Sequence, residues 1–130
     1  YENGKEITQW VSSPTEFITD LSSIVFNTQS RCNIQAITDC IFYSISKANY
    51  NKLNQLLPAW PLLEKQFIAK CFLVLEDRVF SFLSLSSEER YNHLFNTRKE
   101  LFNQVSLHYL ASMLGMTAET LSRIRKKQIS

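Results

Sequence analysis

Cysteine and long uncharged runs are scarce in this chain of 130 residues, and each scarcity argues against a class of protein. The three cysteines, Cys32, Cys40 and Cys71, are odd in number and lack CxxC spacing, so neither a disulfide framework nor a zinc site is supported. We interpret them as small buried residues rather than redox sensors. The longest uncharged window, residues 101–118, contains too many polar side chains and a glycine for a membrane span. No basic and apolar leader is visible, and we expect a soluble, cytoplasmic protein.

Catalytic motifs are missing as well. The sequence shows no Gly-rich phosphate loop, no paired-carboxylate cleft and no nucleophile motif. His93 and His108 have no carboxylate or cysteine partner at the spacing of a metal site or a catalytic triad. We therefore expect no enzyme, no metal and no cofactor.

What is present is an uneven distribution of charge. Residues 1–57 hold four Lys/Arg against five Asp/Glu, and residues 58–85 hold three of each kind. Residues 86–130 hold seven Lys/Arg against four Asp/Glu. Positive charge therefore collects toward the C-terminal end, as expected if that end meets a polyanion.

Three kinds of sequence follow one another along the chain. Between residues 5 and 45, short β-branched and aromatic runs such as EITQWV, SRCNIQAI and CIFYSIS predict strands. KANYNKLNQLL predicts a short helix that ends at Pro58 and Pro61, where we place a boundary. Residues 62–85 then run without glycine or proline and predict a major helix whose wide apolar surface suggests burial on two sides. Ser86 and Glu89 form a capping box that predicts the start of a further helix.

The stretch LASMLGMTAETLSRIRKK, residues 110–127, has the pattern of a helix-turn-helix. Gly115 can adopt the left-handed turn that ends a first helix, and Thr117 begins a second one. At about 100° per residue, the second helix places Leu121, Ile124 and Gln128 on one side. Its other side carries Glu119, Ser122, Arg123, Lys126 and Lys127.

The polar side of this second helix suits DNA. Arginine can form a bidentate contact with guanine, and glutamate can accept from the cytosine amino group. The lysines further along the helix would reach only phosphates. Basic residues in a last turn also complement the helix dipole without binding anything, so only the combination with the glycine turn and the apolar side favours DNA.

These segments resemble a known family. YLASMLGMTAETLSRIRKK looks like the helix-turn-helix of the Crp/Fnr regulators, the catabolite activator protein family, especially the short Bacteroidetes-type members. Residues 75–96 are similar to the end of their dimerisation helix and the helix after it, and residues 16–53 resemble the last part of their cyclic-nucleotide-binding-like β-roll. The resemblance implies an α+β fold with a partial β-roll sensor domain over residues 1–57, whose first strands precede Tyr1. A dimerisation helix over 58–85 and a helix-turn-helix DNA-binding domain over 86–130 follow.

The resemblance also implies roles for individual residues. Three residues of this chain, Glu119, Ser122 and Arg123, fall at positions where the family contacts base edges. Ser106, His108 and Thr117 fall at positions where the family contacts the DNA backbone. The implied partners are a palindromic double-stranded DNA operator, a second copy of the chain and RNA polymerase, with no membrane.

The effector site departs from the family pattern. Thr19 and Asp20 stand where cyclic-nucleotide binders have a Gly-Glu pair, and Ser30 stands at the position of the phosphate-binding arginine. Arg31 comes one residue late, and in a strand this offset sends a side chain to the opposite face. We therefore expect that cAMP does not bind, and that the effector is another small molecule or absent.

We thus predict a homodimeric transcription regulator that reads DNA with the helix over residues 117–128. Two rival classes stay open. One is a β-roll sensor or protein-interaction module that no longer binds DNA, and the other is an enzyme.

Overall fold

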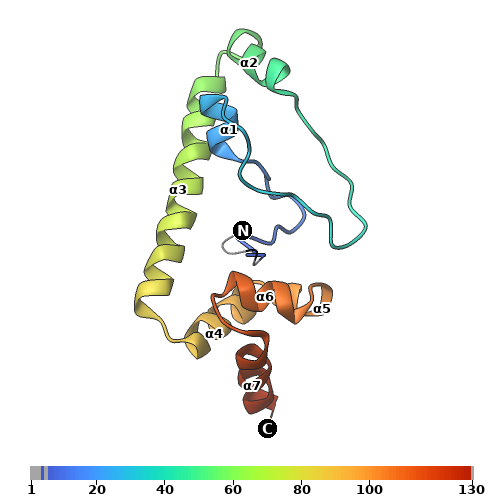
Figure 1. The fold of residues 1–130 in the computed structure, drawn as a ribbon. Coiled ribbons are helices and arrows are strands. Elements are labelled where there is room, and N and C mark those ends of the chain that lie inside the picture. Colours follow the sequence, from blue (N-terminus) through green and yellow to red (C-terminus); the bar gives the residue numbers. More distant parts are fainter. Residues whose placement is uncertain (1–3, 5, 130) are drawn as a thin grey trace. The chain divides into compact units, whose positions relative to one another are not determined.

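The computed structural model describes residue 4 and residues 6–129 (Figure 1). Within these residues the secondary structure is entirely helical. The helices are α1 (Leu21–Phe26), α2 (Lys47–Leu56), α3 (Trp60–Ser84), α4 (Ser87–Thr97), α5 (Leu101–Gln104), α6 (Leu107–Met113) and α7 (Ala118–Ile129). None of the described helices is both long enough and apolar enough to cross a membrane.

The predicted β-roll is wrong, because no strand occurs in the part of the chain that the structure describes. The runs named as strands are irregular, and LSSIVF, which lies between the first two of them, forms α1. Asp20 starts this helix by accepting a hydrogen bond from the Ser22 amide. Every residue from 28 to 45 is exposed and has no strand beside it. A β-branched run becomes a strand only when a neighbouring strand supplies its hydrogen bonds, and these runs find none.

The helices predicted from capping and apolar patterns are confirmed. α2 begins at Lys47, where the Ser46 hydroxyl accepts from the Asn49 amide. α3 starts at Trp60, slightly earlier than predicted, because Pro61 fits a first turn that needs no amide donor. At the start of α4 the Ser86 amide donates to Glu89 Oε2 at 2.8 Å and the Glu89 amide donates to Ser86 Oγ at 3.3 Å.

The chain divides into two compact units at Ile18/Thr19 and at Arg78/Val79, the second point lying inside α3. We call the residues up to Ile18 together with those from Val79 onward the terminal unit. The residues between them, Thr19–Arg78, form the central unit. Each unit is described by itself below.

The terminal unit contains every described residue that is buried. Tyr91, Phe95 and Phe102 form an aromatic group with ring centroids 5.3–5.8 Å apart. Among the described residues, the core comprises Val11, Tyr91, Leu94, Leu101, Phe102, Val105, Leu110, Ala111, Met113, Leu114, Leu121 and Ile124. The core therefore joins α4, α5, α6 and α7 into one hydrophobic cluster.

Residues 6–18, which we call the N-terminal strap, belong to the same unit. Val11 is part of the core, and the Thr8 amide donates to the hydroxyl of Ser112 on α6 at 2.9 Å. Arg98 donates to Ser13 Oγ at 2.7 Å and pairs with Glu16 at 3.3 Å. Its guanidinium also lies 5.3 Å from the centre of a tryptophan ring in the strap. The strap, assigned to the sensor domain by sequence, instead packs on the helical core.

The central unit has no buried residue at all. The Tyr50 hydroxyl donates to the Glu64 carboxylate, and the Tyr50 ring meets the Trp60 ring edge-on at 5.6 Å. Cys32 and Cys40 are exposed and Cys71 is half-buried, so the prediction that the cysteines are buried is wrong.

Candidate nucleic-acid interface

The turn between α6 and α7 has the geometry predicted from Gly115. The Met116 amide donates to the Ala111 carbonyl at 3.0 Å, and the Gly115 amide donates to the Ser112 carbonyl at 3.1 Å. Gly115 itself has φ +66°, so the two bonds and the left-handed residue make a Schellman motif. This motif ends α6 and redirects the chain into α7 within a few residues.

Thr117 caps the start of α7, as predicted. Its hydroxyl oxygen accepts from the Thr120 amide at 3.1 Å and lies 3.0 Å from the Thr120 hydroxyl. Glu119 follows in the first turn, where the positive end of the helix dipole stabilises a carboxylate.

One face of α7 is buried and the opposite face is exposed. Leu121 is completely buried and Ile124 is nearly so, while Gln128 is exposed despite its prediction for the buried side. The other residues assigned to DNA lie on the outer face. Glu119, Arg123, Lys126 and Lys127 are exposed there, and Ser122 is half-buried. α7 thus buries an apolar side against α6 and α4 and presents a mainly cationic side.

The residues predicted to touch the DNA backbone lie at the starts of two helices. Ser106 is the N-cap residue of α6, is exposed, and makes no side-chain capping bond. His108 is exposed in the first turn of α6, with its ring 5.7 Å from that of Tyr109. Thr117 is exposed at the start of α7. Each of the three therefore presents a polar group that solvent, or a ligand, can reach.

Arg90 on α4 holds the turn in place, and the sequence analysis missed it. Its Nε donates to the Leu114 carbonyl at 3.1 Å, and its Nη1 donates to the Leu85 carbonyl at 2.7 Å. The guanidinium also lies 5.1 Å from the centre of the Phe82 ring. One side chain thus bonds carbonyls at the ends of α6 and α3. No local pattern signals the contact with α6, because Leu114 is 24 residues from Arg90 along the chain.

Two further contacts join the end of α7 to α4. Lys127 Nζ lies 3.2 Å from Glu88 Oε2, and the Gln128 amide donates to the Asn92 side-chain oxygen. Glu88 and Asn92 are one turn apart on α4, so both contacts lie along the same seam. Neither acceptor was singled out from sequence, because the partners are almost forty residues apart along the chain.

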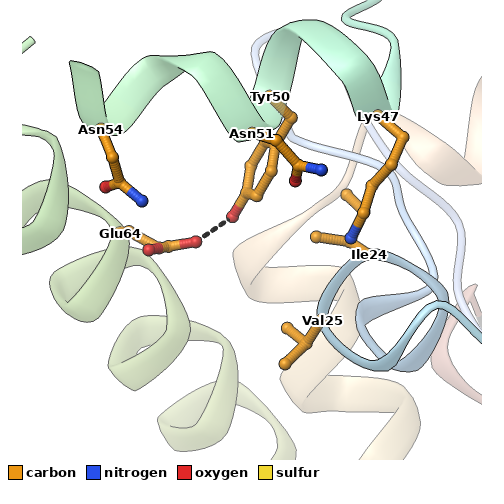
Figure 2. A pocket seen from close by; sticks show the side chains of 7 residues that line it. All are labelled: Ile24, Val25, Lys47, Tyr50, Asn51, Asn54 and Glu64. Atoms are coloured by element: carbon orange, nitrogen blue, oxygen red, sulfur yellow. Dashed lines mark hydrogen bonds between the residues drawn. The ribbon is translucent and has the colours of Figure 1, made fainter. Parts of the chain in front are cut away.

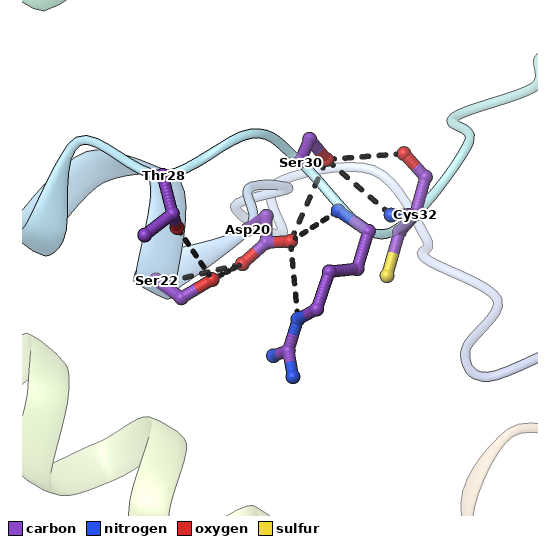
Figure 3. A network of polar contacts seen from close by, with 6 residues as sticks. Asp20, Ser22, Thr28, Ser30 and Cys32 are labelled. Atoms are coloured by element: carbon purple, nitrogen blue, oxygen red, sulfur yellow. Dashed lines mark hydrogen bonds and ion pairs between the residues drawn. The ribbon is translucent and has the colours of Figure 1, made fainter.

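The four residues predicted for an effector pocket are only partly brought together (Figure 3). Asp20 accepts from the Ser22 hydroxyl at 2.7 Å, from the Arg31 amide at 2.9 Å and from the Ser30 hydroxyl at 3.5 Å. The hydrogen bond from the Arg31 amide, followed by that from Ser22, lowers the pKa of Asp20 to about 2. Arg31 Nε is 4.0 Å from Asp20, and Thr19 is half-buried outside this network. The carboxylate is thus occupied by its own chain.

A cavity of about 330 Å³ lies elsewhere in the central unit (Figure 2). Desolvation, aided by the hydrogen bond to Glu64, raises the pKa of Tyr50 to about 12. The cavity is lined by Ile24, Val25, Lys47, Tyr50, Asn51, Asn54 and Glu64. None of the predicted effector residues contributes to it.

Comparisons with protein-family models, curated proteins and solved structures find no match for this chain. The chemistry available to the helix-turn-helix is therefore judged from its own side chains. An exposed arginine and glutamate one turn apart, beside exposed lysines, can bond base edges and phosphates.

Proposed function

We propose that this protein binds double-stranded DNA sequence-specifically and that α7 is its recognition helix. The observation that supports this most is the division of α7 into two faces. Leu121 and Ile124 are buried, whereas Glu119 and Arg123 are exposed on the opposite side, in the N-terminal half of the helix. In helix-turn-helix proteins the N-terminal residues of the second helix contact base edges in the major groove.

Within this proposal the side chains divide by role. Arg123 donates two hydrogen bonds to a guanine, Glu119 accepts from a cytosine amino group, and Ser122 bonds either base. Lys126, Ser106 and His108 bond phosphates and set the register of the protein on the duplex. Lys127, predicted from sequence for the same role, is left out of this group because it pairs with Glu88 on α4. Thr117 also belongs to this group. Its oxygen accepts the Thr120 amide. Its hydroxyl hydrogen donates to a phosphate when the Thr120 hydroxyl is the donor in the contact between the two threonines.

We further propose that the protein acts as a homodimer joined through α3. Large apolar side chains are exposed along this helix, namely Leu62, Leu63, Ile68, Phe72, Leu73, Val74, Leu75, Val79, Phe80, Phe82 and Leu83. Exposed apolar patches of such extent are unusual on soluble monomers and mark interaction sites. A two-fold axis would present two copies of α7 to half-sites about 34 Å apart. Sedimentation as a monomer at micromolar concentration would contradict the homodimer.

The resemblance of residues 109–127 to the Crp/Fnr helix-turn-helix adds support for a role in transcription regulation. Only this part of the resemblance supports the proposal, because the described residues contain no β-roll. The apolar surface of α3 also favours an alternative, in which the chain is a protein-interaction module that does not bind DNA.

Arg123→Ala and Lys126→Ala together separate DNA recognition from this alternative. A site selected from a random duplex library serves as the specific probe, and an unselected duplex serves as the control. We expect Arg123→Ala to weaken the specific site by about 1–3 kcal/mol and to affect the unselected duplex less. Lys126→Ala should weaken both duplexes alike and lower the salt slope by about one unit. If both variants and the parent show the same weak affinity for every duplex, the interaction-module alternative takes over.

A further inference from the structure

Glu88 lies where it can compete with DNA for one of the cations of α7. Its Oε2 is 3.2 Å from Lys127 Nζ, and both side chains remain open to solvent. The second contact of the seam, from Gln128 to Asn92, holds the same end of α7 against α4. Lys127 and its neighbour Gln128 therefore both contact α4.

The position of Lys127 on α7 differs from that of the other polar residues. At about 100° per residue, Glu119, Arg123 and Lys126 lie within about 60° of one another, opposite Leu121. Lys127 lies at the edge of this face, on the side of Ile124, which packs into the core. A side chain at this edge reaches either a DNA phosphate or α4, but not both at once.

From this geometry we infer that Glu88 is a specificity-determining residue, which withholds Lys127 from the phosphate backbone. The inference rests on the proposed function. Phosphate contacts strengthen binding to all sequences, whereas base contacts strengthen binding to one. An acidic residue that neutralises a flanking lysine and repels phosphates lowers non-specific affinity. It leaves Arg123 and Glu119 untouched, and so widens the ratio between specific and non-specific binding.

The test measures salt-dependent binding of the full chain and three variants, Glu88→Gln, Lys127→Gln and the double variant, to the selected and the unselected duplex. Glu88→Gln releases Lys127, so we expect the salt slope to steepen by about one unit and non-specific affinity to rise by about tenfold near 0.1 M salt. Lys127→Gln alone should leave the slope of the parent unchanged. The double variant should return to that slope.

Glu100→Gln is the matched control, because it makes the same change in net charge in the terminal unit, where Glu100 accepts from Ser13 rather than from α7. An equal effect of Glu88→Gln and Glu100→Gln would overturn the inference, since only net charge would then matter. A flatter slope for Lys127→Gln would overturn it too, because Lys127 would already contact a phosphate. In both cases the proposed function would stand. Absence of duplex binding by the parent and by Glu88→Gln alike would instead overturn the proposed function, and the inference with it.

Discussion

Both the terminal and the central unit contain large apolar side chains, but only the terminal unit buries any of them. In the terminal unit, residues such as Leu110 and Leu121 are fully buried. In the central unit, Ile41 and Tyr43 are 90% and 100% exposed, and no residue is buried. The difference shows that an apolar run contributes to stability only when another element covers it. We therefore expect the free energy of unfolding to depend mainly on the terminal unit.

Leu110→Ala gives the largest expected effect on this comparison. Leu110 is fully buried on α6, so its truncation removes apolar burial and leaves a cavity, which costs about 2–5 kcal/mol. Leu56→Ala, the same change at a 68% exposed position on α2, should alter stability by less than about 0.5 kcal/mol. Urea denaturation measures both values. Equal losses would show that the central unit has a core of its own in solution.

Arg90→Met should cause the next largest loss of stability. Losing the charged hydrogen bonds to the Leu114 and Leu85 carbonyls should cost about 1.5–3 kcal/mol. Arg123→Met is the control, because Arg123 is exposed on α7 and no described contact holds it. Its expected cost in stability is below about 0.5 kcal/mol, although it should weaken DNA binding. Thermal melts of the two variants would contradict this if Arg123→Met proved the more destabilising.

Gly115→Ala should cost about 1–2 kcal/mol, because an alanine at φ +66° is strained. The new Cβ would also approach Phe82 Cε1 to 2.5 Å, so the ring must shift. Gly4→Ala shares the positive φ but meets nothing within 4 Å, and it should cost less. The difference between the two losses in thermal stability measures the contact with Phe82. If the losses are equal, that ring moves without cost.

The smallest expected effect is the loss of stability at acidic pH that depends on Asp20. The pKa of Asp20 is held at about 2, below the roughly 3.9 of an unfolded chain. At a pH between these two pKa values, the Asp20 carboxyl is more often protonated in the unfolded state than in the folded state. Stability from Asp20 is therefore complete above about pH 4 and is lost as the pH falls toward 2. Carboxyl titration by NMR checks the pKa, and Asp20→Asn should remove this part of the acid dependence. A titration near pH 4 would contradict the hydrogen-bonded network around Asp20.

The features predictable from sequence are those whose causes are local. The Ser86–Glu89 capping box, the Gly115 turn and the Thr117 cap all depend on residues within a few positions of one another, and the structure contains all three. The burial of Leu121 and Ile124 followed from helical periodicity.

The failures all concern contacts between segments that are distant along the chain, which local sequence neither predicts nor excludes. The apolar runs before residue 46 were interpreted as strands, but β-structure requires a second segment that these residues do not meet. Arg90 and Glu88 were overlooked because Leu114 and Lys127 lie 24 and 39 residues away. The resemblance to Crp/Fnr regulators implied a β-roll as well as a helix-turn-helix, and both had local sequence support. Among the described residues, only the local features of the helix-turn-helix are present.

The strap also sets an order of events during synthesis. Thr8 bonds to Ser112 across 104 residues, and Val11 belongs to a core cluster that also includes the later-made Leu121 and Ile124. At about 5–20 residues per second on the ribosome, the strap waits roughly 5–20 s for its acceptor. During this interval Val11 and Trp10 have no helical core to cover them. The strap therefore cannot take up its packed position until α6 and α7 have been synthesised.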